Sequence, residues 1–366
     1  MLTGIRVIEI EGLGPAPFAA MMLADLGADV ICVHRKAEGA GLMPAHPIID
    51  RGKRSITLDL KSPADVETLL HLVETADALV EGFRPGVMER LGLGPITCHA
   101  RNPDLIYGRM TGWGQDSPLA ETAGHDLNYI ALSGALWYDA TPGTPPQPPA
   151  TLVGDIGGGA LYLVAGILAA LVRRETRHGD TPAGCVVDAA IYDGSAHMMN
   201  LLMTLQQAGQ FSSLRGKSLL DGPHWSRCYV CADGGYISVQ CLEPQFYAEF
   251  LSRLDLSEDA QFARQHDKSL WPVLGARLAG IFAAQPRDHW DRLFKGSDAC
   301  VAPVLSPIEA EAHPMNQRRT WVTAENGLQA AAAPRFSGQD SWEVPPAPAR
   351  GQHNSEILAK LRQRQR

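Results

Sequence analysis

The feature that most constrains the fold is a strand, a turn and a helix near the N-terminus, followed directly by a second strand. Residues Arg6 to Ile10 are predicted to form a strand that leads through the turn Gly12–Pro17 into a helix from Phe18 to Leu26, and a second strand follows from Asp29 to Val33. This order is typical of two parallel strands with the connecting helix packed on one face of the sheet. The sequence therefore predicts an α/β fold built on a Rossmann-like parallel sheet.

The alternation of strands and helices continues along the first half of the chain. A helix is predicted from Pro63 to Thr75, and short apolar runs near Leu79 and at Leu105–Tyr107 are predicted to be buried strands. Further on, a long helix is predicted from Gly157 to Arg174 and a strand from Cys185 to Asp188. We expect these elements to extend the same sheet.

The pattern changes after about residue 225. Residues Tyr229–Val239 are predicted to form a β-hairpin with Asp233-Gly234-Gly235 at its turn, and mainly helical segments follow. A chain of 366 residues is also long enough for more than one hydrophobic core. We therefore expect a large domain formed by residues 1–225 and completed by residues 310–366, and a small α+β domain at residues 226–309.

The composition argues against several classes of protein. A net charge of −8 disfavours general nucleic-acid binding. The most apolar stretch, Ala160 to Val172, is short for a membrane span and ends at Arg173, so we expect a buried helix. Seven scattered cysteines are typical of the reducing cytoplasm, and Cys228-x-x-Cys231 has no second ligand pair for a zinc site. We expect a cytoplasmic protein without a bound metal and without a secretory signal, because the N-terminus leads directly into a strand.

The first turn and the end of the second strand indicate which ligand the sheet binds. Gly12-x-Gly14 follows the first strand as in dinucleotide-binding proteins, but Pro17 stands where the third glycine of that motif belongs. Arg35 and Lys36 follow the second strand, where an NAD-binding protein carries an acid. Two interpretations remain for these cations and for the cluster Arg51–Ser55: solvated surface charge, or contacts to the phosphate groups of coenzyme A.

Two glycine-flanked phrases contain the strongest candidates for catalysis. His125 lies in Gly124–Tyr129 and Asp155 in Gly154–Gly159, and each phrase is predicted to begin a helix. A helix N-terminus favours a neutral imidazole and a charged carboxylate, and the amides of residues 155–157 are candidate donors to an enolate oxygen. If His125 and Asp155 face each other across a carbon atom, they can move protons on its two faces, which is racemase or epimerase chemistry. If Asp155 alone reacts, it is the nucleophile of a transferase.

Several phrases together resemble the family III CoA-transferases and, within them, the α-methylacyl-CoA racemases. The most specific is the phrase that begins at Gly124 and continues to Gly134, because transferases of the family generally lack its histidine. The other phrases are Gly12-Leu13-Gly14-Pro15-Ala16-Pro17-Phe18, Arg51-Gly52-Lys53-Arg54-Ser55-Ile56-Thr57-Leu58-Asp59-Leu60-Lys61, Glu81-Gly82-Phe83-Arg84-Pro85-Gly86-Val87-Met88-Glu89, Glu243-Pro244-Gln245-Phe246-Tyr247 and Gly296–Leu305.

The resemblance implies a site and an assembly. It implies that His125 and Asp155 are the acid/base pair, that Glu243 orients His125, and that the protein is an interlocked homodimer of ring-like protomers. From the residues alone, a salt bridge or an exposed acid at a helix start explains Glu243 equally well. Coenzyme A is then part of the substrate, so no separate cofactor is expected. The implied binding residues are Arg35, Leu58, Asp59, Leu60, Lys61, Gly82, Phe83, Arg84, Gly124, Asp126, Asn128 and Tyr129.

Three functions follow from these observations. The leading hypothesis is a racemase or epimerase of 2-methylacyl-CoA, the second a CoA-transferase that uses Asp155 as nucleophile, and the third a catalytically silent acyl-CoA-binding protein. Asp126 is interpreted as a charge in the first helical turn and not as a catalytic group, because neighbours on a helix point in different directions. The chain departs from the racemases at Thr151, where they often carry an asparagine that lies four positions before the catalytic aspartate. No membrane or nucleic-acid partner is expected.

Overall fold

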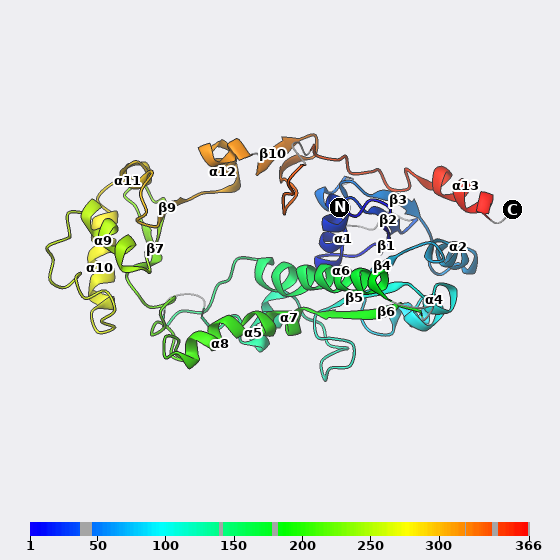
Figure 1. Ribbon diagram of the computed structural model, residues 1–366, viewed down its shortest axis with the longest axis horizontal. Coiled ribbons are helices and arrows are strands. Elements are labelled where there is room, and N and C mark those ends of the chain that lie inside the picture. The colour runs from blue at the N-terminus through cyan, green and yellow to red at the C-terminus, as the bar shows by residue number, and fades with distance from the viewer. Residues whose placement is uncertain (37–45, 139–141, 178–181, 319, 339–342, 365–366) are drawn as a thin grey trace. The chain divides into compact units, whose positions relative to one another are not determined.

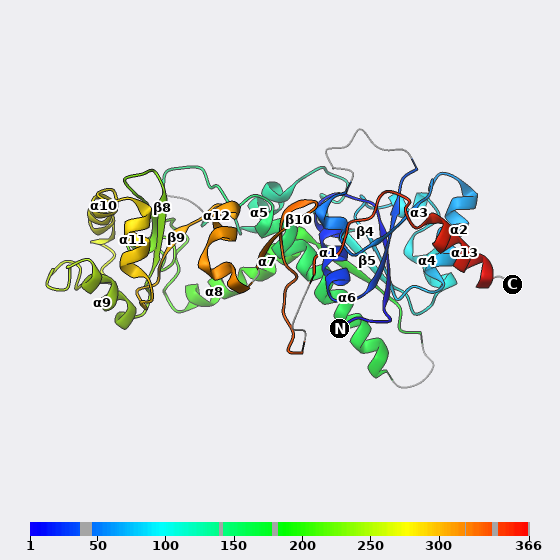
Figure 2. The same ribbon diagram turned by 90° about the horizontal axis from the view of Figure 1, so that it is seen from above.

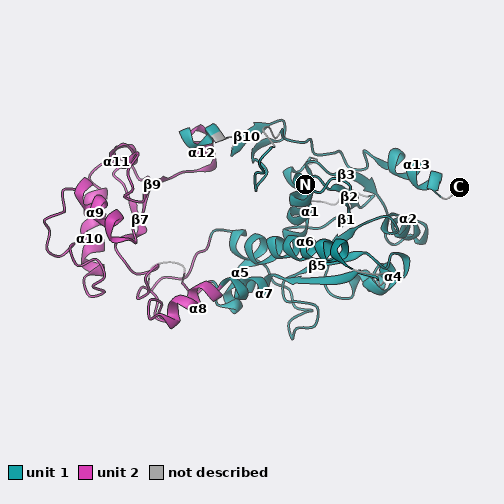
Figure 3. Ribbon diagram, viewed as in Figure 1, with its two compact units in different colours: residues 1–135, 149–198, 314–366 teal, residues 136–148, 199–313 magenta. Residues whose placement is uncertain are grey.

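The computed structural model describes residues 1–36, 46–138, 142–177, 182–318, 320–338 and 343–364. These residues form two compact units: residues 1–135, 149–198 and 314–366 make the first, and residues 136–148 and 199–313 the second (Figure 3). The expected boundary at residue 225 differs from this division, because residues 136–148 and 199–225 group with the second unit. Tyr138 and Phe211 show why, since their rings pack with centroids 4.1 Å apart.

The first unit is built on a six-stranded parallel sheet with strand order β3-β2-β1-β4-β5-β6 (Figure 1). This is the strand order of a Rossmann-like sheet, as predicted. Strand β3 was not predicted, because its four residues lie within a run of cations that hides the apolar pattern. The strands are β1 (Arg6–Ile10), β2 (Asp29–His34), β3 (Arg54–Thr57), β4 (Ala78–Glu81), β5 (Ile106–Thr111) and β6 (Cys185–Ala190).

Helices cover both faces of this sheet (Figures 1 and 2). Side chains of a strand alternate between the faces. Val7 of β1 therefore packs in the core beneath α1 (Pro15–Asp25) and α6 (Leu161–Thr176), whereas its neighbour Ile8 packs in the core on the other face. That second core is covered by α2 (Pro63–Val73), α3 (Val87–Arg90), α4 (Pro95–Arg101) and α13 (Asn354–Arg364).

The apolar helix predicted from Gly157 begins earlier, at Leu152. Its first nine residues, Leu152–Ala160, are π-helical (η2), and α6 continues it. The combined segment Leu152–Thr176 is long and apolar enough to cross a membrane, and 44% of its most apolar window is buried. It packs closely on the sheet, because a Cβ atom added at Gly166 would lie 2.5 Å from Val187 of β6. This packing is that of a core helix, as predicted.

The other elements of the first unit are short, and the second unit is a small α+β structure. The expected hairpin is present as β7 and β8, and β9 extends it to an antiparallel sheet of order β7-β8-β9. The short elements of the first unit are η1 (Ile48–Asp50), α5 (Asp126–Ser133), α7 (Ile191–Met198), η3 (Pro314–Arg318), β10 (Trp321–Ala324) and β11 (Gly327–Ala330). The elements of the second unit are α8 (Asn200–Gln207), β7 (Ser226–Val230), β8 (Tyr236–Gln240), α9 (Pro244–Arg253), α10 (Trp271–Phe282), α11 (Arg287–Phe294), β9 (Val301–Val304) and α12 (Pro307–Ala312).

The C-terminal segment covers the exposed edge of β3. Ser55 N–H donates to Nδ1 of His353 at 3.0 Å, and the His353 N–H donates back to the Ser55 carbonyl at 3.0 Å. Thr57 N–H donates to Oδ1 of Asn354 at 2.9 Å. The last segment of the chain therefore satisfies the edge of the sheet in place of another strand.

Within the cationic cluster Arg51–Ser55, Arg51 and Lys53 are neither solvated at the surface nor available to a phosphate group, contrary to both interpretations of the sequence. Arg51 is buried and pairs with Asp25 at 2.5 Å. Lys53 is buried and its Nζ lies 2.6 Å from Oε2 of Glu9 on β1. These cations fold inward because buried carboxylates of the sheet and of α1 require counter-charges.

Lys53 also explains a group of potential metal ligands. The ligand atoms of Cys32, His34 and Asp50 lie within 4.8 Å of one another and are all buried. Lys53 Nζ lies 3.3 Å from Oδ1 of Asp50, and burial raises the pKa of the Cys32 thiol well above its ordinary value. A buried ammonium beside a neutral thiol supplies the positive charge that a metal ion would bring, so we interpret the group as a buried charge network.

We expect Lys53→Met to destabilise the protein strongly, because it leaves the Glu9 carboxylate buried without a counter-charge. The expected loss in the free energy of unfolding, measured by urea denaturation, is about 3 kcal/mol. Lys295→Met, at an exposed lysine, is the matched control and should change stability by less than about 0.5 kcal/mol. Equal effects of the two substitutions would contradict the assigned role of Lys53.

Candidate active site

The first candidate, His125, caps the N-terminus of α5. Its backbone is extended, and its N–H donates to Oδ1 of Asn128 at 3.1 Å, which closes the first turn of the helix. The His125 side chain is exposed. The structure thus confirms the predicted helix start and leaves the imidazole accessible to a ligand.

Two aromatic rings support the turn before His125. The Tyr129 hydroxyl donates to the carbonyl of Gly124, and the Trp113 and Tyr129 rings pack edge to face with centroids 4.7 Å apart. A Cβ atom at Gly124 would lie only 2.7 Å from Tyr129, so only glycine fits there. Gly124, Asn128 and Tyr129, which the resemblance assigns to ligand binding, have a structural role at the start of α5.

The second candidate, Asp155, lies in η2 and is held by Asp126. Oδ1 of Asp126 accepts hydrogen bonds from the N–H groups of Gly154 at 2.8 Å and of Asp155 at 2.7 Å. Asp126 is buried, and a Cβ atom at Gly154 would lie 2.5 Å from its Oδ1. Asp126 follows His125 directly in the chain, so one carboxylate joins the two candidate catalytic residues.

Two of the three amides expected to stabilise an enolate donate hydrogen bonds within the protein. Asp155 N–H donates to Asp126, and Ile156 N–H donates to the carbonyl of Thr151 at 3.1 Å. The prediction of an enolate hole at residues 155–157 is therefore wrong for the amides of Asp155 and Ile156. The reason is the π-helical turn, which directs the amides back into the protein.

Thr151 compensates for the asparagine that the racemases often carry. Its Oγ1 donates to Oδ2 of Asp155 at 3.1 Å. Its backbone has φ 65°, a left-handed conformation that is unfavourable for a β-branched residue. Thr151 is thus strained, and its hydroxyl orients one oxygen of the Asp155 carboxylate.

Burial raises the pKa of Asp155 above the ordinary value of a carboxyl, and the neighbouring charge of Asp126 adds to the rise. The hydrogen bond from Thr151 and the charge of His125 act to lower the same pKa. We expected the helix start to favour the charged carboxylate, but desolvation outweighs that effect. A raised pKa makes Asp155 a stronger base, and the interaction with His125 places the two side chains within electrostatic reach of each other.

The first βα turn reaches the same site. A Cβ atom at Gly14 would lie 3.8 Å from Oδ2 of Asp155, so the Gly12–Gly14 turn packs beside the catalytic candidate. Burial and the charge of Asp155 raise the pKa of Tyr129, whereas the charge of Arg84 lowers it. Arg84, Tyr129 and Asp155 therefore belong to one region at the carboxyl edge of the sheet, where ligands of such folds bind.

The other predicted ligand-binding residues lie at the ends of β2, β3 and β4. Arg35, Asp59, Lys61, Gly82 and Arg84 are exposed. Leu58 is buried in the core between the sheet and α2, which leaves its side chain unable to contact a ligand. Leu60 and Phe83 are half-buried against the same core. Ligand binding by the exposed members of this set stays a prediction.

Two groups of ion pairs and hydrogen bonds hold the turns at this edge of the sheet, and neither could be predicted from the sequence. Arg350 pairs with Glu11 at 2.5 Å and donates to the carbonyl of Arg35 at 3.0 Å, while Glu11 accepts from the Arg35 N–H at 2.8 Å. In the same way, buried Glu81 accepts from Phe83 N–H at 2.7 Å and from Arg109 at 2.9 Å. Because Arg350 lies more than 300 residues from Glu11, only the folded chain reveals the contact.

Glu243 lies elsewhere, in the second unit. It is exposed and occupies the N-cap position of α9. Its predicted action on His125 stays a prediction.

Removing the carboxylate of Asp126 should damage the site from within. Asp126→Ala leaves one buried and one partly buried amide without an acceptor, so we expect a loss of about 2–4 kcal/mol in the free energy of unfolding. Asp126→Asn keeps one carbonyl oxygen and should lose less than half of that amount. Urea denaturation of the two variants tests this, and equal losses would show that the accepted hydrogen bonds do not matter.

Two substitutions at Thr151 separate the effect of its strained backbone from that of its hydrogen bond to Asp155. Thr151→Val retains the strained backbone but loses the donor, so the pKa of Asp155 should rise above its value in the unmodified protein. Thr151→Asn suits the left-handed conformation better and should raise the free energy of unfolding by about 1 kcal/mol. Carbon-13 NMR titration of the Asp155 carboxyl, combined with urea denaturation, checks both; an unchanged pKa in Thr151→Val would refute the proposed effect of the hydroxyl.

Comparison with known proteins shows the family of the chain. The model of CoA-transferase family III matches residues 2–354. α-Methylacyl-CoA racemase of Mus musculus is 40% identical over 98% of this chain and 92% of its own, and the Homo sapiens racemase is 38% identical over 98% and 93%. The crystal structure of a CAIB/BAIF family protein from Brucella suis aligns with a TM-score of 0.78 at 26% identity, over 98% of each chain. The chain belongs to CoA-transferase family III.

Proposed function

We propose that the protein is a racemase or epimerase that interconverts the (R) and (S) forms of 2-methylacyl-CoA thioesters. The observation that carries the proposal is the joint placement of His125 and Asp155, which are two proton-transfer groups linked by the carboxylate of Asp126. The racemase relatives support the same substrate class. An imidazole and a carboxylate of raised pKa are suited to exchange a proton with a weak carbon acid.

The proposed reaction has two steps. One of the two groups removes the α-proton of the thioester, which leaves an enolate, and the other group donates a proton to the opposite face of the same carbon. Either residue serves as base or as acid, according to which epimer is bound. Return of the proton to the original face restores the starting epimer, so inversion requires both residues.

The coenzyme A part of the substrate is proposed to lie along the carboxyl edge of the sheet. Arg35 and Arg84 are exposed cations that follow β2 and β4, and each can contact phosphate. The turn that contains Arg35 is held in place by Glu11 and Arg350. Because coenzyme A belongs to the substrate, the reaction needs no additional cofactor.

We further propose that the active form is a cytoplasmic homodimer in which Glu243 orients His125. Exposed apolar side chains of the first unit support the presence of a partner surface. These side chains are Leu127 and Leu132 of α5, Leu152 of η2, and Leu161 and Val172 of α6. Size-exclusion chromatography with light scattering tests whether the protein is a dimer.

The test is exchange in D2O with a single epimer of a 2-methylacyl-CoA. We expect deuterium at the α-carbon together with loss of optical purity, without a second substrate. His125→Ala and Asp155→Ala should each lower the inversion rate by about 10²–10⁴-fold. Each single variant should still bind substrate, and one epimer should exchange faster than the other because one base remains.

The rate should also depend on pH through Asp155. The carboxylate must be ionised to act as base, so the rate should fall as the pH falls below its raised pKa. An absence of α-exchange across branched acyl-CoAs, together with trapping of Asp155 by hydroxylamine in the presence of an acceptor acid, would favour the CoA-transferase alternative instead. Ligand affinity without either reaction would favour a silent acyl-CoA-binding protein.

A further inference from the structure

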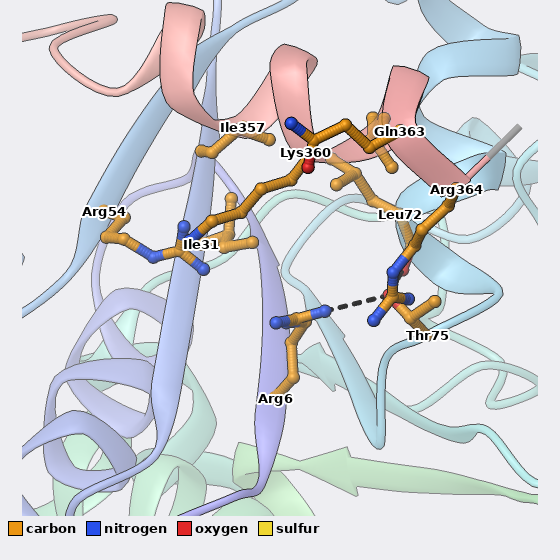
Figure 4. A pocket seen from close by; sticks show the side chains of 10 residues that line it. Arg6, Ile31, Arg54, Leu72, Thr75, Ile357, Lys360, Gln363 and Arg364 are labelled. Carbon is orange, nitrogen blue, oxygen red and sulfur yellow. Dashed lines mark hydrogen bonds between the residues drawn. The ribbon is translucent and has the colours of Figure 1, made fainter. Parts of the chain in front are cut away.

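The first unit has a cavity of about 250 Å³ at the amino ends of its strands. Arg6 and Arg54, the first residues of β1 and β3, line it together with Thr75 after α2 and with residues of α13 (Figure 4). The candidate active site lies at the carboxyl ends of the parallel strands, which is the opposite edge of the sheet. None of the residues of that site lines the cavity.

The cavity carries an excess of positive charge. Four cations line it: Arg6, Arg54, Lys360 and Arg364. Two carboxylates beside it are each shared between two of these cations. Asp29 pairs with Arg6 at 3.0 Å and with Arg54 at 2.6 Å, and Glu356 pairs with Arg54 at 3.3 Å and with Lys360 at 2.8 Å. Two positive charges are left in excess.

Arg6 is held ready for a further partner. Its Nε donates to Asp29 at 3.0 Å and its Nη1 to the Thr75 hydroxyl at 3.0 Å. These contacts fix the plane of the guanidinium and leave Nη2 as its remaining edge. A fixed guanidinium loses little conformational entropy on binding an oxyanion, which favours recognition of phosphate.

Arg364 brings a second guanidinium to the same place. Both arginines line the cavity with Thr75, and in the view of Figure 4 their guanidinium groups lie near the Thr75 side chain. Within the part of the chain that the structure describes, no carboxylate pairs with Arg364. Neighbouring guanidinium groups repel each other unless an anion lies between them, so this arrangement is favourable when one is bound.

The rest of the wall is formed by four apolar side chains and by the amide of Gln363. Ile31, Leu72, Ile357 and Leu361 line the cavity between the cations. The volume exceeds that of one phosphate group and leaves room for a second group beside it.

We propose that this cavity is a binding site for a small phosphorylated anion with at least two negative charges, held between Arg6 and Arg364. Arg54 and Lys360 neutralise the rest of its charge. The shared chemistry is that of a diphosphate group, which is available as free pyrophosphate or as the diphosphate of a nucleotide. The site is separate from the proposed reaction and does not depend on it.

Isothermal titration of the full-length protein with inorganic pyrophosphate, and in parallel with ADP, tests the proposal. We expect saturable binding that Arg364→Gln weakens about tenfold, the effect of losing one charge-assisted contact. Arg362→Gln is the matched control, because it removes the same charge from the same helix but from a residue that does not line the cavity. It should change the affinity less than about twofold. Tighter binding of ADP than of pyrophosphate would identify a nucleotide as the ligand, and the reverse order would identify the free anion.

Arg35→Gln distinguishes this cavity from the opposite edge of the sheet. Pyrophosphate affinity should be unchanged in that variant if the anion binds at the amino edge. The proposal is overturned if pyrophosphate and ADP show no saturable binding, if Arg362→Gln weakens binding as much as Arg364→Gln does, or if only Arg35→Gln weakens it. Circular dichroism of each variant confirms that the fold is retained.

Discussion

The geometry of the candidate site depends on one carboxylate oxygen, Oδ1 of Asp126. It accepts the N–H groups of Gly154 and Asp155, so it supplies the acceptor that the start of η2 would otherwise lack. Because Asp126 is the first residue of α5, the same interaction fixes the start of that helix, where His125 is the N-cap. The two helix starts cannot move apart without leaving buried amides unsatisfied. A single polar contact thus sets the relation between an imidazole and a carboxylate 30 positions apart in the chain.

Opposing electrostatic effects then set the chemistry of Asp155. Burial and Asp126 raise its pKa, whereas the Thr151 hydroxyl and His125 lower it. The first pair of effects makes the carboxylate a better base, and the second keeps it from being protonated too readily. Thr151 contributes from a left-handed backbone that is unfavourable for threonine, and strain of this kind is commonly found at functional sites. The rest of the carboxyl edge is held by buried or half-buried ion pairs, in which Glu11 and Glu81 anchor the turns that present Arg35 and Arg84.

Parts of the fold followed from local patterns, and other parts did not. The strand at Arg6–Ile10 and the helix start at His125 were predictable, because each depends on residues close together in the sequence. The helix after the first strand begins at Pro15, three residues before its predicted start. Strand β3 was missed because cations interrupt its apolar pattern. Those cations were interpreted as surface charge or as phosphate contacts, because their partners are distant in sequence. Arg51 and Lys53 can be buried because they pair with Asp25 and Glu9 in the folded chain. The π-helical turn at Asp155 was also hidden, since glycine-rich sequence suits a close approach but does not specify the backbone hydrogen bonds.

The sequence by itself determined the parallel α/β sheet and the two residues most suited to proton transfer, because strand alternation and helix capping are local properties of the chain. The tertiary structure alone decided how those residues are used. In the folded chain Asp126 accepts hydrogen bonds from Gly154 and Asp155, and the Ile156 amide donates to the Thr151 carbonyl. The Thr151 hydroxyl donates to the carboxylate of Asp155. The tertiary structure also gathered Arg6, Arg54 and the cations of α13 around one cavity at the other edge of the sheet. These contacts join charges and hydrogen-bond donors that are far apart in the sequence. Burial makes each such contact stronger, and the loss of its partner more costly.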